Sequence, residues 1–295
     1  TITEGAQVAP YVRNLTYTGL LNVTVGGTAG RDRIQTDQGS DTIRGGDGND
    51  WIQGGAGTDS SVGGNGDDVI LNAGGFDTLI GGPGNDALKG GTNGDVISGN
   101  SGADFLQSGL LGANSTGGSG NDQELGGPGL DSLAGDAGND WIEGATGNDT
   151  LIGDTLAPYG VGADGNGDDV VIGGSATDTI GGGGGMDIFV GASNTLGSTV
   201  VPQIDDYVGG AGFDWTTYFG SRSPRADLAN FAAALPAGDP GLLLDSFLDV
   251  EALSGGEFND TLNGDNRTTL DRPDSLVTDR LTGVDVTGID GLAAL

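Results

Sequence analysis

The chain contains no cysteine and no histidine, and only one lysine, Lys89. Without cysteine, neither a disulfide nor a thiolate metal site can form. Without histidine, the usual general base and the usual zinc or haem ligand are missing. Aromatic residues make up only 5% of the 295 residues, so a large conventional core is excluded. We therefore expect no catalytic residue in this chain and no enzyme activity.

Long apolar runs are also missing, and basic residues are few. No run of 18 apolar residues occurs, so we expect no membrane span. The chain begins at Thr1 without a signal-peptide pattern, which suggests a mature, trimmed or partial protein. With 42 acidic and 10 basic residues the formal net charge is −32. This charge argues against binding nucleic acid or an anionic membrane and favours cations as partners.

Glycine is abundant, with 63 residues. Such a composition is typical of a disordered acidic chain, because each ordered glycine loses more conformational freedom than any other residue. The order of the residues argues otherwise. Laid along the chain, the nonamer GGDGNDWIQ (45–53) fits 14 times from Gly27 to Ile152 without insertion or deletion. A flexible linker requires a composition but no such register.

Three positions of the nonamer carry the pattern. Position four is glycine in 12 of the 14 copies, and position eight is apolar in 11. Position six is aspartate in 13 copies, with Ala113 as the exception: Asp32, Asp41, Asp50, Asp59, Asp68, Asp77, Asp86, Asp95, Asp104, Asp122, Asp131, Asp140 and Asp149. The period restarts at Asp164 and gives Asp169, Asp178, Asp187 and Asp205 in phase. Further copies occupy 209–217 and 255–263.

Two other interpretations of the acidic residues are weaker. The stretch DGNGDD (164–169) is similar to an EF-hand loop, but it lacks the glycine at position six and the glutamate at position twelve. Paired carboxylates also occur in glycosidases. The regular spacing of the aspartates favours metal ligation.

The pattern GGxGxDxUx, where U is apolar, resembles the repeats-in-toxin (RTX) family of secreted bacterial proteins. The resemblance implies an all-β fold, a parallel β-roll with 18 residues per coil. Six turn residues and three strand residues make a half-coil, so residue i lies beside residue i+18, about 4.8 Å away. Asp50, Asp68, Asp86 and Asp104 then line one edge, and Asp59, Asp77 and Asp95 line the other.

Such a stack is unstable without counterions. Two carboxylates about 5 Å apart repel by roughly 3 kcal/mol at an effective dielectric constant near 20. Each coil buries only about two Ile or Leu side chains, worth about 2–3 kcal/mol each. We therefore expect the metal-free chain to be disordered and Ca²⁺, which prefers six to eight hard oxygen ligands, to fold it.

The resemblance also implies the ligands. One turn supplies the carbonyls of positions two and four with its aspartate, and the next turn on the same edge supplies positions one and three with its aspartate. This set implies three sites: Gly46, Gly48 and Asp50 with Gly63, Asn65 and Asp68; Gly64, Gly66 and Asp68 with Gly81, Pro83 and Asp86; and Gly55, Gly57 and Asp59 with Asn72, Gly74 and Asp77. Counting pairs predicts about a dozen ions.

We expect three regions in the chain. Residues 1–26 form an N-terminal β cap, and 27–217 form the calcium-binding roll, interrupted at 153–163 and 191–208. Residues 218–295 form a C-terminal capping region with the late repeat at 255–263. In this region ADLANFAAAL suggests a short helix, and LLLDSFLDVEAL suggests a strand or a helix.

Position seven should face outward, and on one edge it is more apolar, with Trp51, Phe105 and Trp141 among its members. This stripe is either a docking face or ordinary strand preference.

Two functions are open. The first is a secreted or cell-surface structural, adhesive or self-assembling module, with other copies or a surface partner. The second is the calcium-binding tail of a secreted protease, lipase, peroxidase or toxin whose catalytic domain lies outside this chain. The RTX resemblance implies export as an unfolded chain through a one-step secretion channel.

Overall fold

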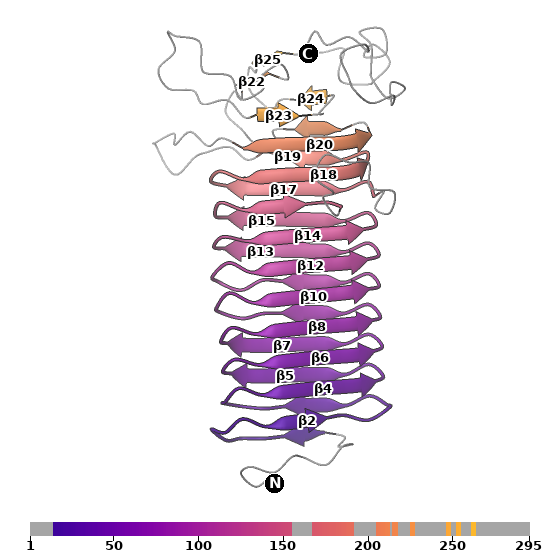
Figure 1. Cartoon of the computed structure of the whole chain (residues 1–295), viewed down its shortest axis with the longest axis vertical. Coiled ribbons are helices and arrows are strands. Elements are labelled where there is room, and N and C mark those ends of the chain that lie inside the picture. The colour runs from indigo at the N-terminus through magenta and orange to yellow at the C-terminus, as the bar shows by residue number, and fades with distance from the viewer. Residues whose placement is uncertain are drawn as a thin grey trace.

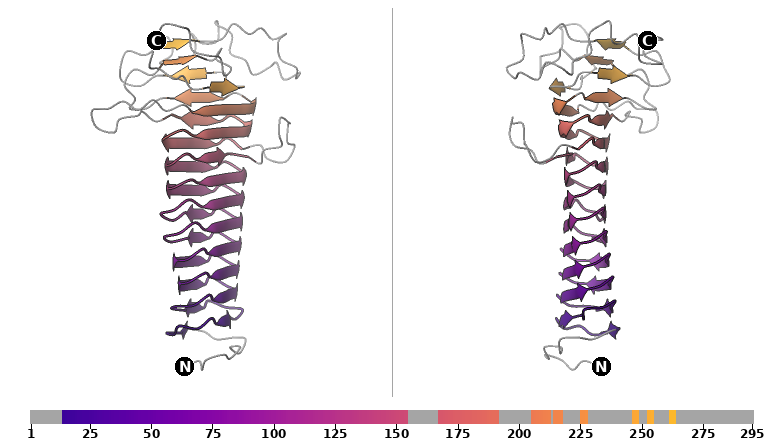
Figure 2. Two further views of the ribbon diagram at one scale, coloured as in Figure 1. Left: turned by 60° about the vertical axis from the view of Figure 1, so that its left-hand side comes forward. Right: turned by 90° about the vertical axis from the view of Figure 1, so that its right-hand side faces the viewer.

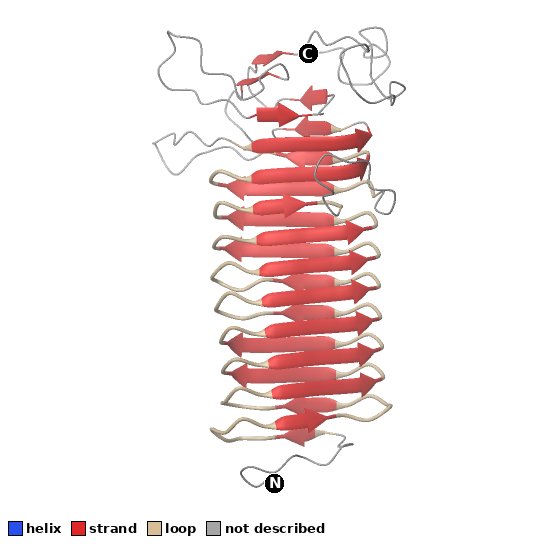
Figure 3. Cartoon of the chain, in the orientation of Figure 1, coloured by secondary structure: helices blue, strands red, loops and turns tan. Residues whose placement is uncertain are grey.

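The structure is a computed structural model of the chain. It describes residues 14–154, 167–191, 205–212 and 214–217, together with the short strands 225–227, 246–248, 252–254 and 261–263. The described residues form a tall stack of coils with the N-terminal end at its base (Figure 1). Strands and loops account for all of these residues, and none is helical (Figure 3).

Two parallel sheets run the length of the stack, and the chain passes from one to the other at every half-coil. The 12-stranded sheet consists of β1 (Leu15–Thr16), β3 (Arg33–Gln35), β5 (Trp51–Ala56), β7 (Val69–Gly74), β9 (Ala87–Lys89), β11 (Phe105–Gln107), β13 (Gln123–Pro128), β15 (Trp141–Thr146), β17 (Val170–Ser175), β19 (Ile188–Val190), β21 (Trp215–Thr217) and β24 (Ala252–Ser254).

The 11-stranded sheet consists of β2 (Thr24–Gly26), β4 (Thr42–Asp47), β6 (Ser60–Asn65), β8 (Thr78–Pro83), β10 (Val96–Ser101), β12 (Asn114–Ser119), β14 (Ser132–Ala137), β16 (Thr150–Ile152), β18 (Thr179–Gly185), β20 (Asp206–Gly212) and β23 (Ser246–Leu248). A separate pair joins β22 (Arg225–Asp227) to β25 (Thr261–Asn263). Seen from the side, the two long sheets lie close together and make a flattened rod (Figure 2).

The register confirms the predicted 18-residue coil. Trp51 pairs with Val69, and Ile52 with Ile70. The same step of 18 residues relates most neighbouring strands up to β16, for example Ile97 and Ser115. The fold is therefore the predicted all-β parallel β-roll.

The core is a single file of position-eight side chains between the sheets. Ile34, Ile52, Ile70 and Leu88 follow one another in one sheet and are at most 1% exposed. Within residues 27–152, three buried polar residues interrupt the file: Ser61, Ser115 and Glu124. Glu124 lies between Leu106 and Ile142, and Ser115 lies between Ile97 and Leu133. At these two adjacent levels the apolar core divides into one cluster that ends at Leu106 and another that begins at Leu133.

Position-seven side chains face outward, as predicted. None of them from Arg33 to Thr150 is buried. Phe105 is 37% and Trp141 is 43% exposed, and the Arg33 guanidinium lies 4.2 Å from the centre of the Trp51 ring.

The ends of the described roll add detail to the expected boundaries. Within residues 14–26, strands β1 and β2 pair with β3 and β4, so this part of the expected cap is a further coil. Strands β23 and β24 extend the two long sheets, so LLLDSFLDVEAL contributes strands. Of the expected helix ADLANFAAAL, Ala226 and Asp227 lie in β22, and the other residues lie outside the described part. The late repeat contributes β25.

Candidate metal centres

Two rows of aspartates run along the turns of the roll. The first edge comprises the turns that lead into the 12-stranded sheet, with Asp32, Asp50, Asp68, Asp86, Asp104, Asp122, Asp140, Asp169, Asp187 and Asp214. The second edge comprises the turns that lead into the 11-stranded sheet, with Asp41, Asp59, Asp77, Asp95, Asp131, Asp149, Asp178 and Asp205. Every one of these aspartates is at most 3% exposed.

A hydrogen bond joins each aspartate to the next in its row. The N–H of Asp50 donates to Oδ1 of Asp68 at 2.7 Å, and the N–H of Asp59 donates to Oδ1 of Asp77 at 2.7 Å. On the first edge nine such bonds link all ten aspartates without a gap. On the second edge the row is broken at Ala113, whose N–H still donates to Asp131. Each side chain is therefore fixed through one of its two oxygens.

The second carboxylate oxygen is buried and has no hydrogen-bond partner in the described residues. This holds for Oδ2 of Asp41, Asp50, Asp59, Asp68, Asp77, Asp86, Asp95, Asp104, Asp122, Asp131, Asp140, Asp149, Asp169, Asp178 and Asp187. A buried carboxylate without a partner costs several kcal/mol, on the order of the desolvation penalty of an ion, unless a cation compensates it. The rows thus present unsatisfied negative charge at regular intervals.

Burial raises the pKa of these carboxyls, although the N–H of the preceding aspartate opposes the shift. The pKa is raised to about 6 for Asp50, Asp59, Asp68, Asp77, Asp122 and Asp178, to about 7 for Asp86 and Asp149, and to about 8 for Asp140 and Asp169. Neighbouring carboxylates of the same row add to the shift, for instance Asp104 and Asp68 around Asp86. Without a cation, part of each row would hold protons near neutral pH.

Main-chain carbonyls, together with the aspartates, line the space between two successive turns of one edge. We call this space a cradle and name it by its two aspartates. In the Asp50–Asp68 cradle, the Gly46 carbonyl points toward Gly64, and the Gly48 carbonyl points toward Gly66. From the next turn, the Gly63 carbonyl faces Gly45, and the Asn65 carbonyl accepts a hydrogen bond from the Gly48 N–H at 2.7 Å.

These directions agree with the ligand set implied by the resemblance. Gly64 and Gly66 point their carbonyls toward Gly82 and Gly84 in the same way, and the carbonyls of Pro83 and Gly74 accept hydrogen bonds from Gly66 and Gly57. Gly81 O faces Gly63, and the Gly57 carbonyl points toward Gly75. That these residues bind calcium remains a prediction.

Glycines at positions two and four adopt the left-handed conformation that this turn needs. Gly46 has a φ of 118° and Gly48 a φ of 105°. Ala145 and Ala176 occupy the same kinds of position with φ values of 75° and 101°, which is costly for a residue with a Cβ. Position one requires glycine for a different reason, which is the space that a side chain would occupy. A Cβ on Gly144 would lie 2.5 Å from Oδ2 of Asp149 and 2.7 Å from the Gly173 carbonyl, inside the cradle.

The donor set suits a hard cation. No three carboxylate, histidine or cysteine side chains converge in the described part of the chain, so a cradle offers two carboxylates and several carbonyls. Ca²⁺ accepts carboxylate and carbonyl oxygens together at 2.3–2.6 Å, whereas zinc prefers nitrogen and sulfur. The residues present therefore fit calcium.

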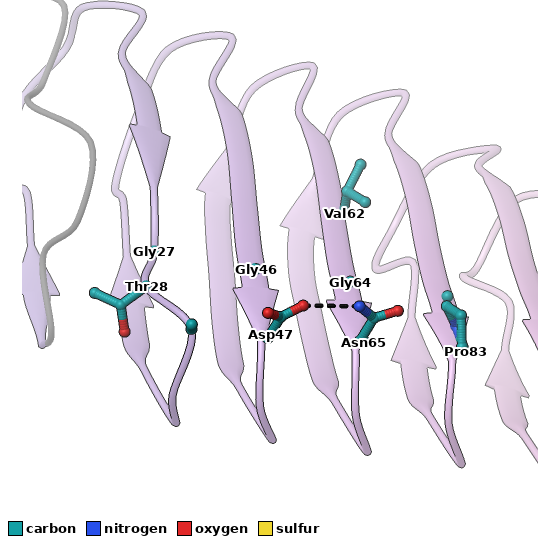
Figure 4. A pocket seen from close by; sticks show the side chains of 10 residues that line it. Gly27, Thr28, Gly46, Asp47, Val62, Gly64, Asn65 and Pro83 are labelled. Atoms are coloured by element: carbon teal, nitrogen blue, oxygen red, sulfur yellow. Dashed lines mark hydrogen bonds between the residues drawn. The ribbon is translucent and has the colours of Figure 1, made fainter.

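Outside the cradles, the turns of the first edge form an open surface. Position-three residues Asp47, Asn65 and Pro83 border a shallow groove of about 510 Å³ beside Gly46 and Gly64 (Figure 4). The Asn65 amide donates to Asp47 across one coil at 2.7 Å. This exposed hydrogen bond links two neighbouring turns of the first edge.

The coil continues across the interruption. Gly153 and Asp154 keep the places of positions one and two, because the Asp154 N–H donates to Gly182 at 2.8 Å and a Cβ on Gly153 would meet Oδ2 of Asp169. The added residues thus follow Asp154, two residues later than the expected start of the interruption.

Two further buried aspartates lie at the turns and were not predicted from the sequence. Asp214 ends the first row, accepting from the Asp187 N–H at 3.0 Å; its signal was the copy GGAGFDWTT (209–217). Asp154 is buried and accepts from the Gly184 N–H at 2.9 Å, and no repeat position pointed to it. Counting hydrogen-bonded aspartate pairs gives nine on the first edge and six on the second.

Comparison with known families agrees with this geometry. The model of the RTX calcium-binding nonapeptide repeat matches residues 26–61, 35–70, 62–79, 72–106, 125–155, 163–193 and 249–266. These matches cover more than half of the chain, so the chain belongs to the RTX calcium-binding repeat family and is a calcium-binding β-roll module. Neither the curated proteins nor the solved structures gave a match.

The family matches leave out residues 107–124. Ala113 and Glu124 lie in or at the edge of this stretch, where the second row and the apolar core are both interrupted. Among the described residues, no helix has the length and apolarity to cross a bilayer.

Proposed function

We propose that this chain is a structural module of a secreted or cell-surface bacterial protein that folds when it meets extracellular calcium. The observation that carries the proposal is the pair of rows of buried carboxylates, fifteen of which have Oδ1 held by the neighbouring coil and Oδ2 without a hydrogen-bond partner in the described residues. Calcium would compensate these oxygens and join successive coils, so that binding and folding are one process.

The charge supports this coupling. A formal net charge of −32 opposes compaction of the metal-free chain, and the single file of core side chains contributes little against it. Because calcium is scarce inside cells and abundant outside, such a chain would stay unfolded during synthesis and fold after export. The absence of cysteine fits a module that is stabilised by metal rather than by disulfides.

The shape supports a structural role in place of a catalytic one. The roll is a long, narrow rod with two flat faces (Figure 2), and its acidic residues are spread evenly along both edges. The calcium-binding tail of a larger secreted enzyme would have the same roll. Electron microscopy of the calcium-loaded chain separates the two roles: self-assembly into filaments or sheets supports the structural one, and dispersed rods argue against it.

A calcium titration followed by circular dichroism tests the central proposal. In EDTA we expect a disordered spectrum, and millimolar Ca²⁺ should produce a cooperative gain of β signal. Mg²⁺ at the same concentration serves as the control, because it demands a small octahedral site and sheds its water reluctantly. A chain that is equally folded in EDTA and in calcium would contradict the proposal.

A further inference from the structure

Position one of the repeat differs between the two edges. On the first edge it is glycine at every described coil: Gly27, Gly45, Gly63, Gly81, Gly99, Gly117, Gly135, Gly153, Gly182 and Gly209. On the second edge, within the regular repeat of residues 27–152, glycine is replaced at Thr36, Asn72 and Ser108, which are 36 residues apart. From Thr36 to Ser108 the replacements therefore fall on every second coil of this edge.

The space beside a position-one glycine is the interior of a cradle. The point where a Cβ on Gly126 would lie is 2.9 Å from Oδ2 of Asp131 and 2.7 Å from the Gly144 carbonyl. At Gly144 the corresponding oxygens lie at 2.5 Å and 2.7 Å. These separations approach the 2.3–2.6 Å of calcium–oxygen contacts. A side chain at position one thus competes with a cation for the same space.

Thr36 places such a side chain in the Asp41–Asp59 cradle. Its side chain is 2% exposed, and its hydroxyl donates a hydrogen bond to the Gly54 carbonyl of the next turn. This carbonyl is the counterpart of Gly63 O in the Asp50–Asp68 cradle. A donor therefore occupies the acceptor that a cation would use.

The turn before Asp41 carries no aspartate. In the preceding turn of this edge Val23 stands where other turns carry aspartate, and its N–H donates to Oδ1 of Asp41 at 2.8 Å. Asp41 is therefore the first aspartate of the second edge in the described residues, and its own N–H donates to Oδ1 of Asp59 at 2.8 Å, so the Asp41–Asp59 cradle is the first on this edge with two carboxylates.

Asn72, another residue in place of a position-one glycine, affects its cradle differently from Thr36. Its Oδ1 accepts a hydrogen bond from the Gly54 N–H at 3.1 Å and lies 2.5 Å from the point of a Cβ on Gly54. The local register shifts so that Gly55 pairs with Asn72 and Ala56 with Gly74. The Asn72 amide oxygen therefore replaces the main-chain carbonyl found elsewhere, and the Asp59–Asp77 cradle keeps its oxygens.

We infer that Thr36 closes the Asp41–Asp59 cradle to calcium, so that the continuous row of ions lies along the first edge while the second edge begins with a cradle held by hydrogen bonds. This inference rests on the proposed binding of calcium between stacked aspartates. It assigns Thr36 as a residue that sets how many ions the roll takes.

Equilibrium dialysis against ⁴⁵Ca²⁺ counts the ions bound per folded chain. Thr36→Gly should bind one ion more than the wild-type chain, because it restores the open glycine of the other cradles. Gly126→Thr, the reverse change on the same edge, should bind one ion fewer. Thr58→Gly is the matched control, since Thr58 is exposed at a turn of this edge, and its count should not change.

The outcomes separate the two proposals. A wild-type chain that binds no calcium would overturn the proposed function itself. A wild-type chain that binds calcium, with an unchanged count in Thr36→Gly, would overturn the role of Thr36 alone. Circular dichroism of each loaded variant shows whether it folds. If Thr36→Gly does not fold, an unchanged count in Gly126→Thr overturns the inference, because a position-one side chain would then not exclude an ion.

Discussion

The N–H of Asp140 donates a hydrogen bond to Oδ1 of Asp169 at 2.8 Å, although 29 residues separate the two in the sequence. Elsewhere the same bond spans 18 residues, as between Asp122 and Asp140. The additional eleven residues therefore leave the stack unchanged, and the aspartate row passes from the first array into the second. The repeats before and after the interruption therefore belong to one stack.

Removing the inserted residues should preserve the fold. Deletion of 155–165 leaves Gly153, Asp154, Asn166 and Gly167 at positions one to four of a regular turn. We expect the melting temperature of the calcium-loaded chain to change by only a few degrees, because loop closure depends weakly on length. Differential scanning calorimetry measures this. Deleting 144–154 instead removes coil residues, and it should lower the melting temperature strongly; equal effects of the two deletions would contradict a continuous coil.

Replacing alanine by glycine in two turns should stabilise the roll. Ala145 and Ala176 have φ values of 75° and 101°, and a left-handed conformation costs a residue with a Cβ roughly 1–2 kcal/mol. Because glycine also raises the entropy of the unfolded chain, we expect Ala145→Gly to gain roughly 1 kcal/mol in the free energy of unfolding, measured by urea denaturation in calcium. Ala134→Gly, in a strand, should lose stability; a loss in Ala145→Gly as well would argue against strain at this turn.

Replacing the buried glutamate should join the two core clusters. Glu124 is 0% exposed, and its two carboxyl oxygens have no hydrogen-bond partner among the described residues. Burial raises its pKa well above the usual value. Glu124→Leu matches Leu106 below and Ile142 above, and should raise the free energy of unfolding by about 2 kcal/mol or more.

Chemical denaturation of the calcium-loaded variant checks this expectation. Glu143→Leu, at a half-buried position of the neighbouring strand, is the control and should change stability by less than about 0.5 kcal/mol. A destabilised Glu124→Leu would mean that the carboxyl has a structural task in the core.

Acidification should partly replace calcium. In the folded state, the pKa of the aspartates in the two rows is raised above the usual value of 3.8, to about 6 for Asp50, about 7 for Asp86 and about 8 for Asp140. Between these values the folded state binds more protons than the unfolded state, so the free energy of unfolding falls as pH rises from about 4 to about 8. In EDTA, we expect β signal to increase as the pH is lowered from about 8 to about 5.

The calcium affinity should change in the opposite direction. Protons and calcium compete for the same carboxylates, so affinity should weaken as the pH falls. Circular dichroism in EDTA and calcium titrations at several pH values test the two halves separately. An EDTA spectrum that is independent of pH, or an affinity that increases in acid, would contradict the shifted pKa values.

The repeat could be predicted from sequence because its cause is local. Glycines, Asp50 and Ile52 recur every nine residues, and an 18-residue coil brings like residues together; the register of Ile52 with Ile70 confirms this. One roll over 27–217 was expected, but the direct pairing of Asp140 with Asp169 could not be predicted, because the nonamer records spacing along the chain and the coil tolerates an insertion within a turn.

The places that side chains at position one take in the structure could also not be predicted from the repeat pattern. Asn72 was predicted to supply a main-chain carbonyl, and the structure directs its amide oxygen into the cradle instead. Nothing in the repeat shows that a side chain can take the place of a backbone group. Glu124 at an apolar position was visible as an exception, but only the stacked coils show that it lies with Ser115 between two clusters.

Each strand of the two long sheets contacts only the coil before it and the coil after it. The cross-section of the rod is therefore independent of its length, and each added coil of 18 residues extends it by about 4.8 Å. The length of such a molecule is set directly by its number of repeats. A gene that gains or loses one repeat pair would change the reach of the protein without disturbing the packing of any other coil.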